Sequence, residues 1–325
     1  MQTTRRGLAA IAVIMAGATG ARAQGQGYPD RPIRFIVPFP PGGPVDTNAR
    51  IIAQALAGPL GHQPVVENRS GAGGNIGVDA VAKSAPDGYT VAFASTGAVA
   101  VNITLIPNMP YDPVRDFAPV SILAATPSVL VVRPNGPANL AELLARARRE
   151  PGKLTFASTG PGGTPHLAAE LLKLRTGVDL THVAYRGAAP AITAMMAGEI
   201  DMTFLDVPVL LPHIREGKFR PLCVTATERS AVLPEVPTTA EAGAPGVEVE
   251  NWYSLLAPAG TPPERVQRLS EAAREVLVPG SETRRRLMEM GARILALDPA
   301  ESGAFIRAEI AKWAEVIRAA NIRPD

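Results

Sequence analysis

The feature that most constrains the fold of this chain is a repeated alternation of two kinds of segment after residue 24. Short runs rich in β-branched residues lead into loops rich in glycine and proline, and then into stretches with helical periodicity. Strands that alternate with helices in this way favour an α/β fold with a largely parallel sheet. We expect strands at 33–37, 65–66, 90–94, 129–132, 154–157, 200–205 and 222–225, and helices at 45–56, 139–149, 165–175, 188–198, 262–277 and 299–319.

Length and composition narrow the possible classes of protein. The chain has 325 residues, which predicts two domains, and its 32 Lys+Arg against 30 Asp+Glu give no reason to expect a nucleic-acid partner. The single cysteine, Cys223, excludes an intrachain disulfide framework and lies in an apolar run where we expect it to be inert. The four histidines lack metal-ligand spacing, so we expect neither a metal nor a cofactor.

The first 23 residues have the pattern of a secretory signal peptide. Arg5 and Arg6 precede an apolar run at 8–21, and the segment ends in Ala-Arg-Ala at 21–23. The apolar run is shorter than the ~20 residues that a membrane-spanning helix needs. We therefore predict that the chain is exported and cleaved before Gln24.

One internal repeat suggests where a ligand binds. Phe-Ala-Ser-Thr-Gly occurs at 93–97 and again at 156–160, each time at the end of an expected strand. A second repeat is Pro-Gly-Gly, which occurs at 41–43 and again at 161–163, each time between an expected strand and an expected helix. Ordinary turn chemistry is the simpler explanation. The functional explanation is that two similar α/β lobes present matching loops to one ligand, since open α/β sheets bind ligands at the carboxyl ends of their strands.

These loops suit a small anion. The start of a helix carries unpaired N–H groups and about half a positive charge, and glycines let a ligand approach the backbone closely. Neither 39–48 nor 157–170 contains an arginine or a lysine, so neutral donors and bridging waters would hold the anion. Hydroxyl donors are available at Ser95, Thr96, Ser158, Thr159 and Thr164.

Three ionisable side chains near these loops have two interpretations each. Asp46 either accepts hydrogen bonds from the start of its helix or shapes the ligand loop. His166 is either structural or a neutral donor to the ligand. Asp206, at a strand end, either caps the next helix or contacts an amino or hydroxyl group of the ligand.

Catalytic motifs are weak by comparison. The glycine-rich run at 71–77 has Ile76 where the dinucleotide fingerprint needs its third glycine, and neither a Gly-x-Ser-x-Gly elbow nor a Walker lysine loop occurs. A secreted serine hydrolase that uses Ser95 or Ser158 with His166 stays as an alternative.

A series of motifs resembles one receptor family. The motifs, in order along the chain, are Tyr-Pro-Asp-Arg-Pro-Ile at 28–33, Val-Pro-Phe-Pro-Pro-Gly-Gly at 37–43 with Asp46, Glu-Asn-Arg-Ser-Gly-Ala-Gly-Gly-Asn-Ile-Gly at 67–77, Asp-Gly-Tyr-Thr at 87–90, Tyr-Arg-Gly at 185–187, Gly-Glu-Ile-Asp at 198–201, Pro-Thr at 237–238, Glu-Ala-Gly at 241–243, Trp-Tyr at 252–253 and Ala-Pro-Ala-Gly-Thr-Pro at 257–262. Together they resemble the substrate-binding receptors of tripartite tricarboxylate transporters, known as the Bug family.

The resemblance implies a two-lobed periplasmic-binding-protein fold of type II that holds a carboxylate between its lobes. It implies that lobe one comprises 24–125 plus 254–325 and lobe two 126–253, and that the loops at 38–46 and 157–166 pinch the ligand. The implied partner is a membrane permease, a signalling partner being the alternative, and we expect a monomer. Where the family often has Val-Pro-Tyr-Lys-Gly, this chain has Ala184 and Arg186 in place of the proline and lysine.

The loops and the resemblance together give one set of candidate ligand-binding residues. They are Phe39, Pro41, Gly42, Gly43, Asp46, Ser95, Thr96, Ser158, Thr159, Gly160, Gly163, Thr164, His166, Arg186 and Asp206.

Overall fold

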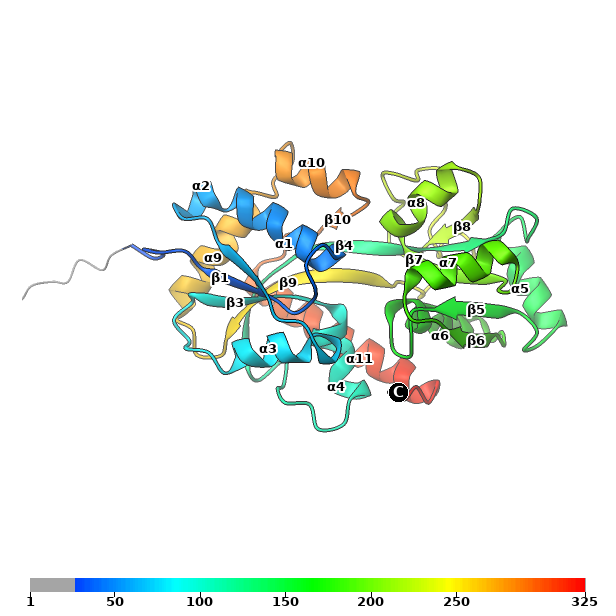
Figure 1. Cartoon of the computed structure of the whole chain (residues 1–325), viewed down its shortest axis with the longest axis horizontal. Helices are drawn as coiled ribbons and strands as arrows, with labels where there is room; N and C mark the ends of the chain where they lie inside the picture. The colour runs from blue at the N-terminus through cyan, green and yellow to red at the C-terminus, as the bar shows by residue number, and fades with distance from the viewer. Residues whose placement is uncertain (1–26, 325) are drawn as a thin grey trace, which may run out of the picture.

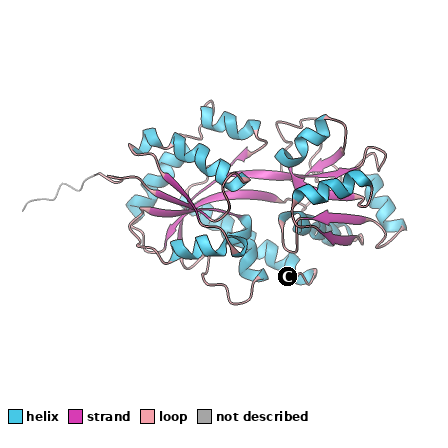
Figure 2. Ribbon diagram, in the orientation of Figure 1, coloured by secondary structure: helices cyan, strands magenta, loops and turns pink. Residues whose placement is uncertain are grey.

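The computed structural model describes residues 27–324, so the predicted signal peptide at 1–23 lies outside the described part of the chain. Strands and helices alternate along it (Figures 1 and 2). The strands are β1 (Arg34–Val37), β2 (Val65–Asn68), β3 (Thr90–Ser95), β4 (Phe117–Val132), β5 (Thr155–Ser158), β6 (Thr181–Ala184), β7 (Met202–Asp206), β8 (Arg220–Val224), β9 (Glu250–Pro258) and β10 (Arg293–Ile294).

The helices begin close to the ends of these strands. They are α1 (Pro44–Ala55), α2 (Ala57–Leu60), α3 (Asn75–Ala82), α4 (Asn102–Leu105), α5 (Leu140–Arg149), α6 (Thr164–Thr176), α7 (Ala188–Ala197), α8 (Val207–Arg215), α9 (Pro263–Glu275), α10 (Glu282–Glu289) and α11 (Pro299–Ala319), with a 3-10 turn η1 (Ala72–Gly74) and a π-helical turn η2 (Gly97–Val101). No helix between residues 27 and 324 is both long and apolar enough to cross a membrane.

The sheet is mixed rather than largely parallel. Its order is β2-β1-β3-β9-β4-β7-β5-β6, with β8 and β10 also paired to β4. The β1, β2 and β3 group and the β5, β6 and β7 group are each parallel, as the alternation predicts. The central strands β4 and β9 pair antiparallel with their neighbours because they connect the two parallel groups and are not part of strand–helix–strand units.

Strand β4 joins the two halves of the molecule. Its residues 117–127 pair with β9, and its residues 128–132 pair with β7 and β8 in the other half. Figure 1 shows β4 and β9 running side by side between the half that contains β1 and β3 and the half that contains β5 and β7. The lobe boundaries given above stay a prediction, and the cavity described below lies between these two halves.

The longest helix, α11, is fixed to β9 by a buried carboxylate. Oε2 of Glu309 accepts hydrogen bonds from Nε1 of Trp252 at 3.0 Å and from Nε1 of Trp313 at 3.1 Å. Both tryptophans are fully buried, so this one oxygen satisfies two indole N–H groups that water does not reach. The contact holds β9 against the C-terminal helix of the same half.

We predict that Glu309→Ala lowers the free energy of unfolding by about 3 kcal/mol, because it leaves two buried donors without an acceptor. Urea denaturation followed by tryptophan fluorescence measures the change. The control is Glu315→Ala on the same helix, which removes only an exposed ion pair with Arg175 and should cost less than about 1 kcal/mol. Equal effects of the two substitutions would contradict the role given to Glu309.

Candidate ligand-binding site

A cavity of about 790 Å³ lies between the two halves, at the ends of strands from both. Its first wall contains the loop that links β1 to α1, and its second wall contains the loop that links β5 to α6. The residues that line it are Phe39, Pro40, Pro41, Gly42, Gly43, Pro44, Val45, Gly73, Ser95, Gly97, Val101, Asn102, Leu105, Thr159, Pro161, Gly162, Gly163, Thr164, Pro165, Ala188, Leu205, Asp206, Val209 and Asn251.

Four helices of eight residues or more begin at this cavity. Helix α1 starts after Gly43, α6 after Gly163, α7 at Ala188 and α8 after Asp206. None of the four has a side chain that caps its first turn. Their backbone N–H groups and the positive ends of their dipoles are therefore available to an acceptor in the cavity.

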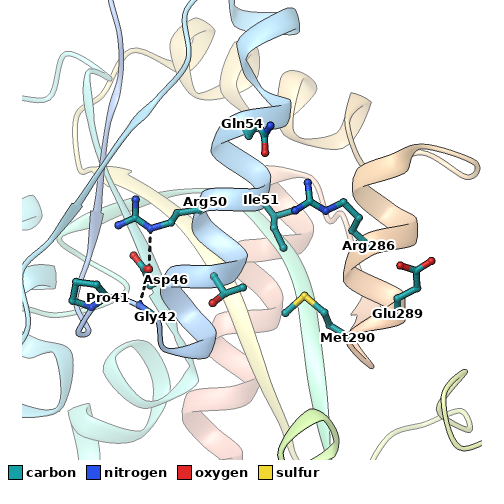
Figure 3. Close-up of a pocket in the computed structure, with 10 residues that line it drawn as sticks. Pro41, Gly42, Asp46, Arg50, Ile51, Gln54, Arg286, Glu289 and Met290 are labelled. Atoms are coloured by element: carbon teal, nitrogen blue, oxygen red, sulfur yellow. Dashed lines mark hydrogen bonds and ion pairs between the residues drawn. The ribbon is translucent and has the colours of Figure 1, made fainter.

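The β1–α1 loop is held by Asp46 from the side away from the cavity. Figure 3 shows its carboxylate between the loop and Arg50, with Oδ2 accepting from the Gly42 N–H and from Nε of Arg50, both at 2.9 Å. Oδ1 accepts from Nδ2 of Asn68 at 2.8 Å, and the same amide donates to the Phe39 carbonyl at 3.0 Å. Burial opposes ionisation of Asp46, but the donors from Arg50, Gly42 and Asn68 outweigh it and hold its pKa below the usual value.

The same loop also faces an outer groove between α1 and α10. This groove (Figure 3) has a volume of about 740 Å³, and Pro41 and Gly42 line both the groove and the cavity. Gly42 has φ of +81°, a left-handed conformation that favours glycine. Asp46 thus fixes a glycine turn that has open space on both sides.

A pair of stacked histidines supports the β5–α6 loop in the other half. Nδ1 of His166 accepts from the Gly162 N–H at 3.2 Å, and the His166 ring stacks on His182 at a centroid distance of 3.9 Å. His182 in turn is 2.6 Å from Oγ of Ser158. Burial, together with the neighbouring His182 and Lys173, lowers the pKa of His166 to about 4, so its Nδ1 stays an acceptor at neutral pH.

The two walls meet where this loop touches α4. A Cβ placed on Gly162 would overlap Cδ2 of Leu105, so any larger residue would have to displace this leucine side chain. Gly162 also has φ of +70°. At this contact, two residues that line the cavity from different halves lie against each other.

Asp206 is the only charged residue among the described residues that line the cavity. Its carboxylate accepts two long hydrogen bonds, one from Oγ of Ser128 on β4 and one from Nδ2 of Asn251 on β9, each at 3.4 Å. Burial raises its pKa to about 6, and these two donors only partly oppose the shift. Asp206 is the residue before α8, but its side chain does not cap that helix.

The structure brings most of the predicted residues to the cavity and places the others outside its lining. Those that line it are Phe39, Pro41, Gly42, Gly43, Ser95, Thr159, Gly163, Thr164 and Asp206. Those that do not are Asp46, Thr96, Ser158, Gly160, His166 and Arg186.

The six residues outside the lining have visible structural reasons for their positions. Asp46 and His166 turn back onto their own loops, and Ser158 bonds to His182 and to the backbone at Gly160. Thr96 bridges to β9 by accepting from the Trp252 N–H at 2.9 Å. Arg186 is exposed in the turn before α7.

Several lining residues were missed by the sequence interpretation. Val45, Val101, Leu105 and Val209 form apolar parts of the wall, and their apolar character alone also fits a hydrophobic core. Asn251 precedes the Trp-Tyr motif at 252–253, and this position at the start of a connecting strand was the available signal. Within residues 27–324 no group of three or more His, Cys, Asp or Glu side chains is arranged to hold a metal ion.

Comparison with known proteins gives consistent matches over most of the chain. A family model described as tripartite tricarboxylate transporter family receptor matches residues 48–322. Protein BugT of Bordetella pertussis is 39% identical over 314 residues, which cover 96% of this chain and 96% of that protein.

Two solved structures with bound dicarboxylates are similar in fold and sequence. An R. palustris protein with adipate has a TM-score of 0.77 and 38% identity, over 92% of this chain and 100% of that chain. MatC from Rhodopseudomonas palustris with bound malate has a TM-score of 0.73 and 35% identity, over 89% of this chain and 100% of that chain.

The two-lobed α/β fold with a cavity between its halves defines a solute-binding protein. Because the family model and the relatives span most of the sequence, the chain belongs to the receptor family of tripartite tricarboxylate transporters, which confirms the resemblance noted above. Members of this family are substrate-binding receptors, so the protein is not an enzyme and the hydrolase alternative is wrong.

We predict that Asp46→Ala releases the β1–α1 loop, because it removes the acceptor of the Gly42 N–H and the partner of Arg50. Hydrogen–deuterium exchange should show faster exchange of the amides at 42–46, with a loss of stability of about 1–3 kcal/mol. Asp79→Ala, which removes only the ion pair with Lys83 on α3, is the control. Unchanged exchange at 42–46 would show that Asp46 does not fix the loop.

Proposed function

We propose that this protein captures a small carboxylate between its two lobes in the periplasm and delivers it to a membrane permease of the tripartite tricarboxylate type. The observation that carries the proposal is the convergence of α1 and α6 on one cavity, each with an uncapped start preceded by glycine at Gly43 and Gly163. A carboxylate placed there accepts hydrogen bonds from the loop backbone of both halves at once.

The electrostatics of the cavity suit an anion that is held without an arginine or lysine. Each helix start contributes about 0.3–1 kcal/mol when exposed and up to about 2 when partly buried, so four starts around one cavity supply a useful sum. The hydroxyls of Ser95, Thr159 and Thr164 on the cavity wall add neutral donors. Bridging waters fill the remaining positions, since they bond nearly as well as direct donors.

The rest of the lining indicates a short carbon skeleton. Val45, Val101, Leu105 and Val209 offer apolar contacts on both sides of the cavity. A volume of about 790 Å³ falls within the range of about 300–1,000 Å³ that small-ligand sites occupy. Adipate and malate, which the two similar solved proteins bind, are carboxylates of this size class, so dicarboxylates head the candidates.

Lobe closure follows from the connections between the halves. We propose lobe one as 24–125 plus 254–325 and lobe two as 126–253, with bending near residue 128 of β4, where its pairing passes from β9 to β7. A rotation there brings the two glycine loops together around the ligand and needs only a few residues to change conformation. The closed receptor is then the form that the permease recognises.

Isothermal titration calorimetry tests the proposal directly. The purified protein, unfolded and refolded to remove any bound ligand, is titrated with adipate, malate, succinate, citrate, glutamate and benzoate. We expect at least one of the carboxylates to bind with a dissociation constant in the micromolar range or below. No heat of binding with any of them, from protein that is shown to be folded, would contradict the proposed function.

We predict that Gly43→Val abolishes binding while the fold is retained. Gly43 has φ of −74° and ψ of 169°, an extended conformation that valine accepts, and an added Cβ meets only the Pro40 carbonyl oxygen at 3.5 Å. The valine side chain would occupy space at the start of α1, and we expect at least about a 100-fold loss of affinity, or about 2.7 kcal/mol.

The control is Gly58→Val on α2, where an added Cβ meets nothing within 4 Å, and which should leave affinity unchanged. Gly163→Val is a poorer test, because its Cβ would lie 2.9 Å from Oγ1 of Thr159 and would disturb the loop itself. Normal affinity of a folded Gly43→Val protein would show that the ligand lies elsewhere.

A further inference from the structure

We propose that the receptor takes up one proton with each carboxylate ligand, and that the carboxyl group of Asp206 is where this proton binds. The inference rests on the proposed function, because it assumes that an anion enters the cavity that Asp206 lines. It goes further by naming a second chemical species in the complex and the residue that determines its binding.

The position of Asp206 carries the argument. It ends β7 and lines the cavity, and it is the only charged group among the described lining residues. A carboxylate ligand therefore meets one other carboxyl group, and no arginine or lysine among the described lining residues offsets its negative charge when it is ionised. Two carboxylates that share a site of low dielectric strongly favour the state in which one of them is protonated.

The surroundings of Asp206 leave room for that proton. Among residues 27–324, its oxygens accept only two hydrogen bonds, each 3.4 Å long, from Ser128 and Asn251. A well-satisfied buried carboxylate such as Asp46 instead accepts three bonds of 2.8–2.9 Å. When protonated, Asp206 becomes a donor and can bond to an oxygen of the ligand, so the repulsion turns into a hydrogen bond.

In the protein without ligand, Asp206 is already easier to protonate than an ordinary aspartate. Burial raises the pKa of Asp206 to about 6 before any ligand is present. An anion beside the carboxyl group moves the pKa in the same direction, so the pKa in the complex lies above that of the free receptor. Between these two pKa values the protein without ligand is ionised and the complex is protonated, which is the condition for proton uptake on binding.

Few other groups on the neighbouring elements compete for this role. Strands β4 and β5 and helix α7 contain no ionisable residue. Strand β9, which reaches Asp206 through Asn251, carries Tyr253 and Glu250, and Glu250 is paired with Arg293. Helix α6, which packs against β7, carries His166, Glu170, Lys173 and Arg175, and helix α8 carries His213 and Arg215 at its far end.

Two of these groups are excluded by the direction of their pKa shifts. Burial raises the pKa of Tyr253, so its hydroxyl keeps its proton in neutral solution. The pKa of His166 is lowered to about 4 by burial and by its neighbours, so it stays neutral above pH 6. Neither takes up a proton near neutral pH when an anion binds.

The chemistry makes a clear distinction between two kinds of ligand. A ligand that places an ammonium group on Asp206 would stabilise the ionised form, and binding would then release protons or leave their number unchanged. A ligand that places only carboxylate or other acceptor oxygens there requires the protonated form. Proton uptake therefore reports which of these two chemistries the cavity accepts.

The experiment measures protons and affinity together. Adipate and malate are titrated calorimetrically into the wild-type receptor at pH 7 in PIPES and in Tris, two buffers with different enthalpies of ionisation. We expect the difference in observed enthalpy to give about one proton taken up per ligand. We also expect affinity to fall as pH rises from 6.5 to 8.5, by up to about tenfold per unit until the pKa of the complex is passed.

The variant Asp206→Asn tests whether Asp206 is the residue that binds the proton. The amide has no charge and keeps a donor, so we expect binding to persist, proton uptake to fall to near zero, and affinity to become independent of pH in this range. The matched control, Glu235→Gln, removes one exposed acid from the same half of the molecule and should behave as wild type. If Asp206→Asn fails to fold, absence of proton uptake by the wild-type receptor would still overturn the proposal, and uptake of about one proton would support it.

The outcomes separate this inference from the proposed function. Binding of adipate or malate without proton uptake, or with uptake unchanged in Asp206→Asn, would overturn the role of Asp206 and leave the carboxylate receptor intact. No binding of any carboxylate at any pH would instead contradict the proposed function itself.

Discussion

The structure depends on one constraint, which is that several helices begin at the same cavity with their first turns uncapped. Backbone N–H groups at such positions need an acceptor, and serine, threonine, asparagine or aspartate usually supplies it. At α1 and α6 the residue before the helix is glycine, and proline follows within the first two helical positions. This choice leaves no side-chain acceptor at the residue before either helix, so the first backbone N–H groups of both helices are available to an oxygen atom in the cavity.

The positions of these loops could be predicted because their chemistry is local. The repeated Phe-Ala-Ser-Thr-Gly at 93–97 and 156–160 does end two strands, β3 and β5, and both copies contribute residues to the cavity wall. Helix α11 was also placed correctly at 299–319, because Asp298 and Glu301 form the capping box that marks its start. A turn or a cap needs only neighbouring residues, so the sequence shows it directly.

The parts that the sequence did not reveal depend on contacts between distant segments. Strand β9 is absent from the strands expected from the residue pattern alone, because its role is to pair with β3 and β4, and these pairings set the mixed topology. Thr164 and Thr261 each precede a proline near a helix start, yet neither hydroxyl caps a helix, because α6 already includes Thr164 and Thr261 donates to the Pro258 carbonyl. The sequence also did not show which of the two matched serines lines the cavity. Ser95 lines it, whereas Ser158 bonds to His182.

The contrast between Asp46 and Asp206 shows why residue type alone could not assign function. Both were candidates for ligand contact, and both are carboxylates near a helix start. Asp46 receives three short hydrogen bonds, one of them from the Arg50 guanidinium, and its pKa falls. Asp206 receives two long hydrogen bonds from neutral donors, and its pKa rises. The first is therefore a fixed charge that holds a loop, whereas the second is a group whose charge can change with the contents of the cavity.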